Sequence, residues 1–186
     1  MPNITDFTGG LPETFCGAGS TLGRTKEIRR ALPGVIERLQ IKRLLDVPCG
    51  DGNWMSDVDI DVKYFGMDVS GRNVAIANAR PWKIKRRKIR QGHAINDPWP
   101  EVDAVMCRDF FQHLNFAQIH ALLNKIKKSG ARYLIGTSYT KLKNREIGPK
   151  LYRPINIEVA PFNFGHPIIR MDEASPHVKL NVYPLR

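Results

Sequence analysis

Residues 44–54 read Leu-Leu-Asp-Val-Pro-Cys-Gly-Asp-Gly-Asn-Trp, an apolar run that ends in an aspartate and a glycine turn. This pattern predicts a strand, a loop and the start of a helix, which is where α/β sheets bind nucleotide-like ligands. Gly50 and Gly52 lack a Cβ, so φ can be positive there and a ligand can approach the backbone. The loop has neither the spacing of a dinucleotide-binding loop nor the Gly-Lys-Ser/Thr of a phosphate-binding loop.

Apolar periodicity on both sides of this loop predicts alternating strands and helices. Strands are expected over residues 41–46, 62–68, 82–90, 102–108 and 132–139, and helices over 23–39, 53–58, 70–80 and 116–128. Loops are expected over 92–100 and 140–153, and two short runs near 168–170 and 178–183 fit a closing antiparallel hairpin. Together these elements predict one Rossmann-like α/β domain over residues 24–186, with a mostly parallel sheet and helices on both faces, after an N-terminal arm over 1–23.

The bulk composition describes a basic globular protein. The chain has 186 residues, 42% of them hydrophobic, which suffices for one domain with a core. Lys and Arg number 29 against 18 Asp and Glu, a net charge of +11. Such an excess favours an anionic partner, although a basic surface without any defined partner explains the charge equally well.

Several features that the sequence lacks indicate where the protein is located and whether it binds a metal. No apolar run approaches the ~20 residues of a membrane helix, and the N-terminus has no signal-peptide layout. Cys16, Cys49 and Cys107 are an odd set without paired spacing, so neither a disulfide scaffold nor a metal site is indicated. We therefore expect a cytoplasmic protein that binds neither a membrane nor a metal.

A second acidic residue supports the glycine loop as a ligand site. Asp68 ends the predicted strand 62–68 and follows the loop by about the ~20 residues at which such folds place a carboxylate on ribose hydroxyls. A carboxylate only accepts hydrogen bonds, so it can take two vicinal hydroxyls at once. The loop and Asp68 are therefore expected to meet at one adenosyl group.

Five motifs together resemble the class I S-adenosylmethionine-dependent methyltransferases, and in particular a bacterial group of mostly unassigned substrate. They are Gly-x-Gly-Ser-Thr-Leu at 17–22, Asp-x-Pro-Cys-Gly-Asp with Asn-Trp-Met at 46–55, Cys-Arg-Asp with His-Leu at 107–114, Ser-Gly-x-Arg-Tyr-Leu at 129–134 and Pro-Phe-Asn-Phe at 161–164. The resemblance spans most of the chain. It implies a methyltransferase domain that uses S-adenosylmethionine and releases S-adenosylhomocysteine.

The resemblance also implies which residues hold the cofactor. They are Ser20, Thr21, Asp46, Pro48, Cys49, Gly50, Gly52, Trp54, Asp68, Val69, His93 and Arg108. Ser20 or Thr21 could equally cap the helix that follows them. Related enzymes often place an acidic residue after the third strand for the adenine amine, and here His93 or Asn96 would take that place.

Asp109 and His113 are the candidate catalytic residues, because they follow the fourth strand and lie one turn apart if helical. In one interpretation Asp109 orients His113, which takes a proton from the acceptor. In the other, Asp109 caps the next helix and His113 packs beneath it. Arg108 either binds an anionic acceptor or pairs with a nearby carboxylate.

The segment Phe162-Asn163-Phe164 is the candidate acceptor site, together with Arg108. Two aromatic rings around an amide can clamp a planar acceptor and bond its edge. Alternatively, the two rings pack into the core of the tail hairpin.

A basic run gives the second candidate function. It contains Lys83, Lys85, Arg86, Arg87, Lys88 and Arg90. These side chains either bind the phosphates of a nucleic acid or protect a sheet edge from pairing. Three functions stay open: methyl transfer to a small molecule or saccharide, methyl transfer to nucleic acid, and a non-catalytic binding or structural role.

Overall fold

The computed structural model describes residues 12–140, 142–147 and 152–185 of the chain. Parts of the predicted arm over 1–23 and of the predicted loop over 140–153 therefore lie outside the described residues. No helix in the described residues is long and apolar enough to cross a membrane.

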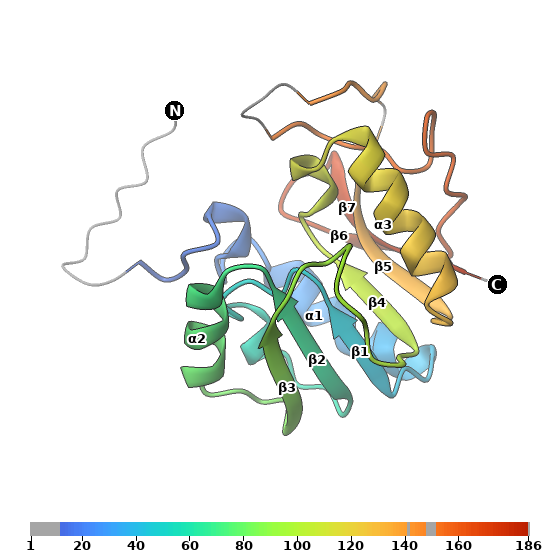
Figure 1. Cartoon of the computed structure of the whole chain (residues 1–186). Helices are drawn as coiled ribbons and strands as arrows, with labels where there is room; N and C mark the ends of the chain where they lie inside the picture. The colour runs from blue at the N-terminus through green and yellow to red at the C-terminus, as the bar shows by residue number, and fades with distance from the viewer. Residues whose placement is uncertain (1–11, 141, 148–151, 186) are drawn as a thin grey trace.

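A seven-stranded sheet forms the centre of the part of the chain described, in the order β3-β2-β1-β4-β5-β7-β6 (Figure 1). The strands are β1 (Arg43–Asp46), β2 (Lys63–Asp68), β3 (Arg86–Gln91), β4 (Ala104–Cys107), β5 (Tyr133–Tyr139), β6 (Ile169–Asp172) and β7 (Val178–Pro184). The first five are parallel, and β7 runs antiparallel to both β5 and β6. The predicted parallel sheet with a closing antiparallel hairpin is confirmed, and β7 lies between β5 and β6.

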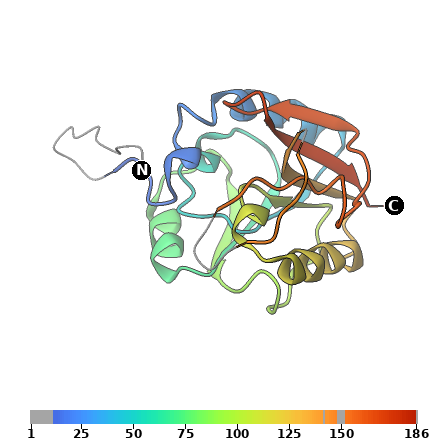
Figure 2. The ribbon, with the colours of Figure 1, turned by 90° about the horizontal axis from the view of Figure 1, so that it is seen from above.

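Helices cover both faces of this sheet, as predicted (Figure 2). The helices α1 (Lys26–Arg38) and α2 (Gly71–Ala79) contribute to one apolar cluster, and α3 (Phe116–Lys128) contributes to the other. Side chains alternate along a strand, so Leu44 of β1 packs in the first cluster and Leu45 in the second. Both are at most 1% exposed, which explains why β1 reads as a continuous apolar run.

The boundaries of two elements differ from the prediction. Helix α1 begins at Lys26 with Thr25 as its N-cap, so neither Ser20 nor Thr21 caps it. Pro33 lies inside α1 without dividing it. Strand β3 starts at Arg86, because Trp82 turns onto α2, where its Nε1 donates to the Ala77 carbonyl oxygen at 2.8 Å.

Two connections are shorter than in a fully wound α/β fold. Between β1 and β2 the expected helix is the single 3₁₀ turn η2 (Met55–Asp57). Between β3 and β4, residues 92–103 contain no helix, in agreement with the loop predicted there. The face of β2 and β3 on the α3 side is therefore not covered by a crossover helix.

Candidate functional site

The glycine loop and Asp68 meet at the carboxyl ends of β1 and β2. These strands are neighbours and parallel, so the loop after β1 lies beside the end of β2. The Gly50 N–H donates to Oδ2 of Asp68 at 2.9 Å, and the Ser70 N–H donates to Oδ1 at 2.8 Å. The predicted meeting of the loop with this carboxylate is confirmed.

Both glycines of the loop adopt the left-handed conformation that favours glycine, with φ of 57° at Gly50 and 71° at Gly52. A Cβ at Gly50 would lie 2.7 Å from Sγ of Cys16, and one at Gly52 would lie 2.5 Å from the ring of Trp82. On these sides, the space that a Cβ would occupy is therefore filled by the protein's own side chains. A ligand must meet the loop from another direction.

Asp46 and Cys49 are buried at the start of this loop. Asp46 is 2% exposed and accepts a hydrogen bond of 2.7 Å from the Tyr64 hydroxyl. Burial raises the pKa of the Asp46 carboxyl to about 7. Burial also raises the pKa of the Cys49 thiol well above its usual range, which disfavours the nucleophilic thiolate. Pro48 follows a cis peptide bond and is half-buried between them.

The described part of the N-terminal arm is fastened onto the glycine loop through Asp51. The carboxylate of Asp51 is fully buried and accepts hydrogen bonds of 2.9 Å from the Thr14 hydroxyl and from the Phe15 N–H. In return, the Asp51 N–H lies 3.1 Å from Sγ of Cys16. Arg80 adds a bond of 2.9 Å from its Nη2 to the Glu13 carbonyl oxygen.

Ser20 and Thr21 belong to the same arm. The side-chain amide of Asn53 donates to the Ser20 carbonyl oxygen at 2.9 Å, which ties the arm to the loop a second time. The hydroxyl of Thr21 donates to the carbonyl oxygen of Ala18 at 2.9 Å. The structure therefore brings Ser20 next to the loop by its backbone, while the Thr21 hydroxyl serves the arm's own turn.

Arg108 is buried between the arm, the end of β4 and the residue after β6. Its guanidinium bonds both carboxylate oxygens of Glu173, at 3.0 and 2.7 Å, and donates to the Gly19 carbonyl oxygen at 2.9 Å. Its charge also lies 5.4 Å from the ring centre of Trp54. With 7% exposure, Arg108 is engaged by protein groups, and the interpretation in which it pairs with a carboxylate describes its contacts.

Asp109 and His113 reach the same edge of the sheet but do not bond each other among the described residues. Asp109 has φ of 50°, and its Oδ1 accepts from the amide of Gln112 at 2.8 Å. His113 ends the 3₁₀ turn η3 (Phe111–His113) and is exposed, with its ring 5.7 Å from that of Tyr152. Asn115 caps α3, so Asp109 does not have that role.

The candidate acceptor segment lies against α3 and β7 and not on the glycine loop. Phe162 is 8% exposed and packs edge-on against Phe116 at 5.1 Å between ring centres. Phe164 packs in the same manner against Tyr183 at 5.6 Å. Asn163 between them is exposed, with φ of 43°. The contacts of both rings are those of core packing.

Val69 and His93 flank the end of β2. Val69 directly follows Asp68 and is 65% exposed, so it presents an apolar side chain beside that carboxylate. His93 is exposed, and its Nδ1 accepts from the N–H groups of Ile95 and Asn96, each at 3.2 Å. His93 therefore uses one ring nitrogen to shape its own loop.

Sequence reasoning missed several residues that build this site. Asp51 was part of the quoted loop, and its place between two glycines was the available signal for a structural role. Tyr64 is itself a fully buried core residue of β2, and its apolar ring gave no signal of a bond to Asp46. Glu173 lies 65 positions from Arg108, and no local pattern connects the two.

The arrangement fits an adenosyl group in one testable respect. Oδ2 of Asp68 accepts one short backbone bond and keeps a lone pair that can accept a ribose hydroxyl, while Oδ1 accepts from the Ser70 N–H and, at 3.4 Å, from the Asn73 amide. Asp68 is 5% exposed, so the carboxylate lies in a mostly desolvated place where such bonds are strong. Val69 offers an apolar surface next to it.

Comparisons with known proteins place this geometry in a class. Residues 44–130 match a family model described as a methyltransferase domain. Magnesium protoporphyrin IX methyltransferase from Synechocystis PCC 6803, solved with bound SAH, superimposes with a TM-score of 0.59 at 12% identity, over 86% of this chain and 84% of that one. The methyltransferase domain of bacterial CtHen1 gives 0.54 at 19% identity, over 62% of this chain and 66% of that one. No curated protein sequence matches.

These findings establish the fold: the chain has a Rossmann-like methyltransferase fold, and residues 44–130 within it match a methyltransferase domain. The [4+2]-cyclase SpnF is also similar, with a TM-score of 0.54 at 21% identity, over 70% of this chain and 53% of that one. At such identities the structural likeness establishes the fold alone.

Proposed function

We propose that the protein transfers a methyl group to a small-molecule or saccharide acceptor at the carboxyl ends of β4 and β5. The observation that carries this proposal is the 2.9 Å bond between the Gly50 N–H and the Asp68 carboxylate, which joins loop and ribose acceptor in one place. When bound, S-adenosylmethionine supplies an activated methyl group for in-line displacement. The protein then has to align the acceptor with this methyl group and exclude water.

Polar side chains at the ends of β4 and β5 suit a hydroxylated acceptor. Asp109 keeps 32% of its side chain exposed there. The hydroxyls of Tyr139 and Tyr152 hydrogen-bond each other, and the exposed ring of His113 packs beside Tyr152. Burial raises the pKa of the Tyr139 hydroxyl above its usual range, so this group stays neutral and can both donate and accept.

In the proposed mechanism the arm and two side chains have separate tasks. The arm, held by Asp51 and Asn53, shields the glycine loop from water. Asp68 orients the ribose. The imidazole ring of His113 is exposed and makes no hydrogen bond among the described residues, so it is available to take the proton that a hydroxyl or amine acceptor loses.

Calorimetry with S-adenosylmethionine and S-adenosylhomocysteine tests the cofactor site. Asp68→Asn is the milder variant, because it keeps one acceptor oxygen for the N–H groups of Gly50 and Ser70, whereas Asp68→Ala would leave both without a partner. We expect at least tenfold weaker binding in Asp68→Asn and no change in Asp59→Asn, an exposed aspartate outside the site. Absence of heat at millimolar ligand would refute both enzymatic functions and leave a non-catalytic role.

A transfer assay addresses the acceptor. S-adenosylhomocysteine release is measured with pooled phenols, amines and saccharides and, separately, with oligonucleotides. We expect turnover with the small molecules and a loss of at least tenfold in kcat for His113→Ala. Turnover with oligonucleotides alone would favour the second candidate, a nucleic-acid methyltransferase, which the basic side chains of β3 support.

A further inference from the structure

One face of β2 and β3 carries a basic surface that the proposed transfer reaction does not use. Side chains alternate along strands, and partners in parallel register share a face. Phe65 pairs with Lys88, and Met67 pairs with Arg90. The face on the α3 side therefore presents the following residues, which we call the basic face: Lys63, Phe65, Met67, Arg86, Lys88 and Arg90.

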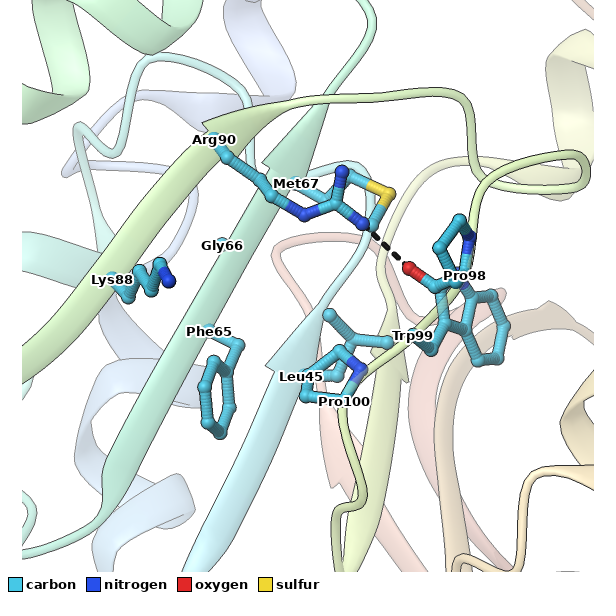
Figure 3. A pocket seen from close by; sticks show the side chains of 9 residues that line it. All are labelled: Leu45, Phe65, Gly66, Met67, Lys88, Arg90, Pro98, Trp99 and Pro100. Carbon is cyan, nitrogen blue, oxygen red and sulfur yellow. Dashed lines mark hydrogen bonds between the residues drawn. The ribbon is translucent and has the colours of Figure 1, made fainter.

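A pocket of about 240 Å³ opens on the basic face (Figure 3). Its floor is apolar and comes from Leu45 and the strand segment 65–67, and Pro98, Trp99 and Pro100 form the opposite wall. Arg90 closes one side, because its Nη2 reaches across and donates to the Pro98 carbonyl oxygen at 2.5 Å. The pocket exists because the connection from β3 to β4 has no helix over residues 92–103.

Cations surround this apolar pocket and continue beyond it. Lys88 lines the pocket and is exposed, and its ammonium group has no hydrogen bond or ion pair among the described residues. Nζ of Lys63 lies 5.4 Å from the ring centre of Phe65. Arg86 lies beside Lys63 and forms an exposed ion pair with Asp61. Alternate residues of a strand are about 7 Å apart, so Arg86, Lys88 and Arg90 form a regularly spaced row of charges.

The two features together identify the chemistry of the occupant. The pocket is smaller than the ~300 Å³ of a drug-sized site, and its size suits one planar ring against Phe65. The row of cations outside the pocket suits a ligand that carries several anionic groups at regular intervals. A single small anion does not have this property. We propose that the basic face binds single-stranded nucleic acid, with one base in the pocket and successive phosphates on Lys63, Arg86 and Lys88.

Protection of the sheet edge alone would not produce this arrangement. The charges that guard an edge strand need only point to solvent, on either face. Here the opposite face of β3 is occupied, since Ile89 is 8% exposed in the core and Arg87 stacks on Trp82 with 5.7 Å to the ring centre. The face that holds the pocket carries four cations, Lys63, Arg86, Lys88 and Arg90.

Fluorescence anisotropy with a labelled ten-nucleotide DNA strand, without cofactor, tests this proposal independently of methyl transfer. Three phosphate contacts predict a slope of about −2 in log K against log salt, which corresponds to about 20-fold weaker binding at 200 than at 50 mM salt. Lys88→Ala should reduce this slope by about 0.7. Arg87→Ala removes the same charge from the opposite face of β3 and is the matched control, with little change expected.

Phe65 distinguishes base stacking from charge attraction. Phe65→Ala should weaken binding about tenfold and leave the salt slope unchanged. Phe65→Leu keeps an apolar floor and should show a similar loss, with circular dichroism verifying the fold of both variants. The proposal is overturned by no binding at 50 mM salt, by equal losses in Arg87→Ala and Lys88→Ala, by unaltered affinity in both Phe65 variants, or by equal affinity for duplex DNA.

Discussion

Asp46 gives the protein a pH-dependent stability that a single substitution should remove. Its carboxyl is 2% exposed at the end of β1, and burial raises its pKa from the ordinary 3.8 to about 7. Such a change corresponds to roughly 4 kcal/mol between the two protonation states. Because the folded-state pKa is the higher one, the folded protein prefers the protonated carboxyl. The associated stability is complete below about pH 4 and is lost as the pH rises through 7.

Asp46→Asn keeps an oxygen that can accept from the Tyr64 hydroxyl but cannot ionise. We therefore expect the ligand-free variant to match the wild type near pH 4 and to exceed it by up to about 4 kcal/mol in free energy of unfolding at pH 8. Urea unfolding at pH 4.5, 6, 7 and 8 measures this difference. Glu173, whose pKa burial also raises, is present in both proteins, so its contribution cancels.

Asp59→Asn is the matched control, because Asp59 is exposed and its substitution should leave the pH profile unchanged. Parallel profiles for the wild type and Asp46→Asn would refute the reasoning, since the carboxyl at the end of β1 would then be solvated as well in the folded as in the unfolded chain.

Two further predictions concern the packing of the site. Gly52→Ala should cost about 2–4 kcal/mol in thermal unfolding, because φ is 71° and the new Cβ would lie 2.5 Å from a tryptophan ring, whereas Gly23→Ala meets nothing within 4 Å and should be neutral. Glu173→Gln should cost about 3 kcal/mol in urea unfolding, because it leaves the Arg108 charge buried without its main partner. Glu101→Gln, at an exposed ion pair, should cost less than about 1 kcal/mol, and equal costs at the two glutamates would contradict this account.

The sequence was most informative where local chemistry determines the structure. The amphipathic pattern and the Asn115 cap define α3, and its observed bounds are those predicted, Phe116–Lys128. Apolar runs located most strands to within a few residues. The start of β3 was placed too early, at Trp82, because this apolar residue packs on α2 and not in the strand. The meeting of Gly50 with Asp68 was also predictable, because it follows from two adjacent parallel strands.

Contacts between distant segments could not be predicted. The pairing of Asp109 with His113 assumed an α-helical turn, but the chain forms a 3₁₀ turn over Phe111–His113, which aims the two side chains differently. The bond from Thr14 to Asp51 joins residues 37 positions apart, and no periodicity reports such a contact.

The position of Arg108 has a consequence for how distant parts of the molecule depend on one another. One guanidinium joins Gly19, near the start of the described chain, to Glu173, near its end. Loss of the Glu173 carboxylate would leave this arginine without its principal counter-ion and would weaken one of the contacts that hold the arm. This one side chain therefore couples the seating of the arm beside the glycine loop to the pairing of the hairpin β6–β7 with the sheet.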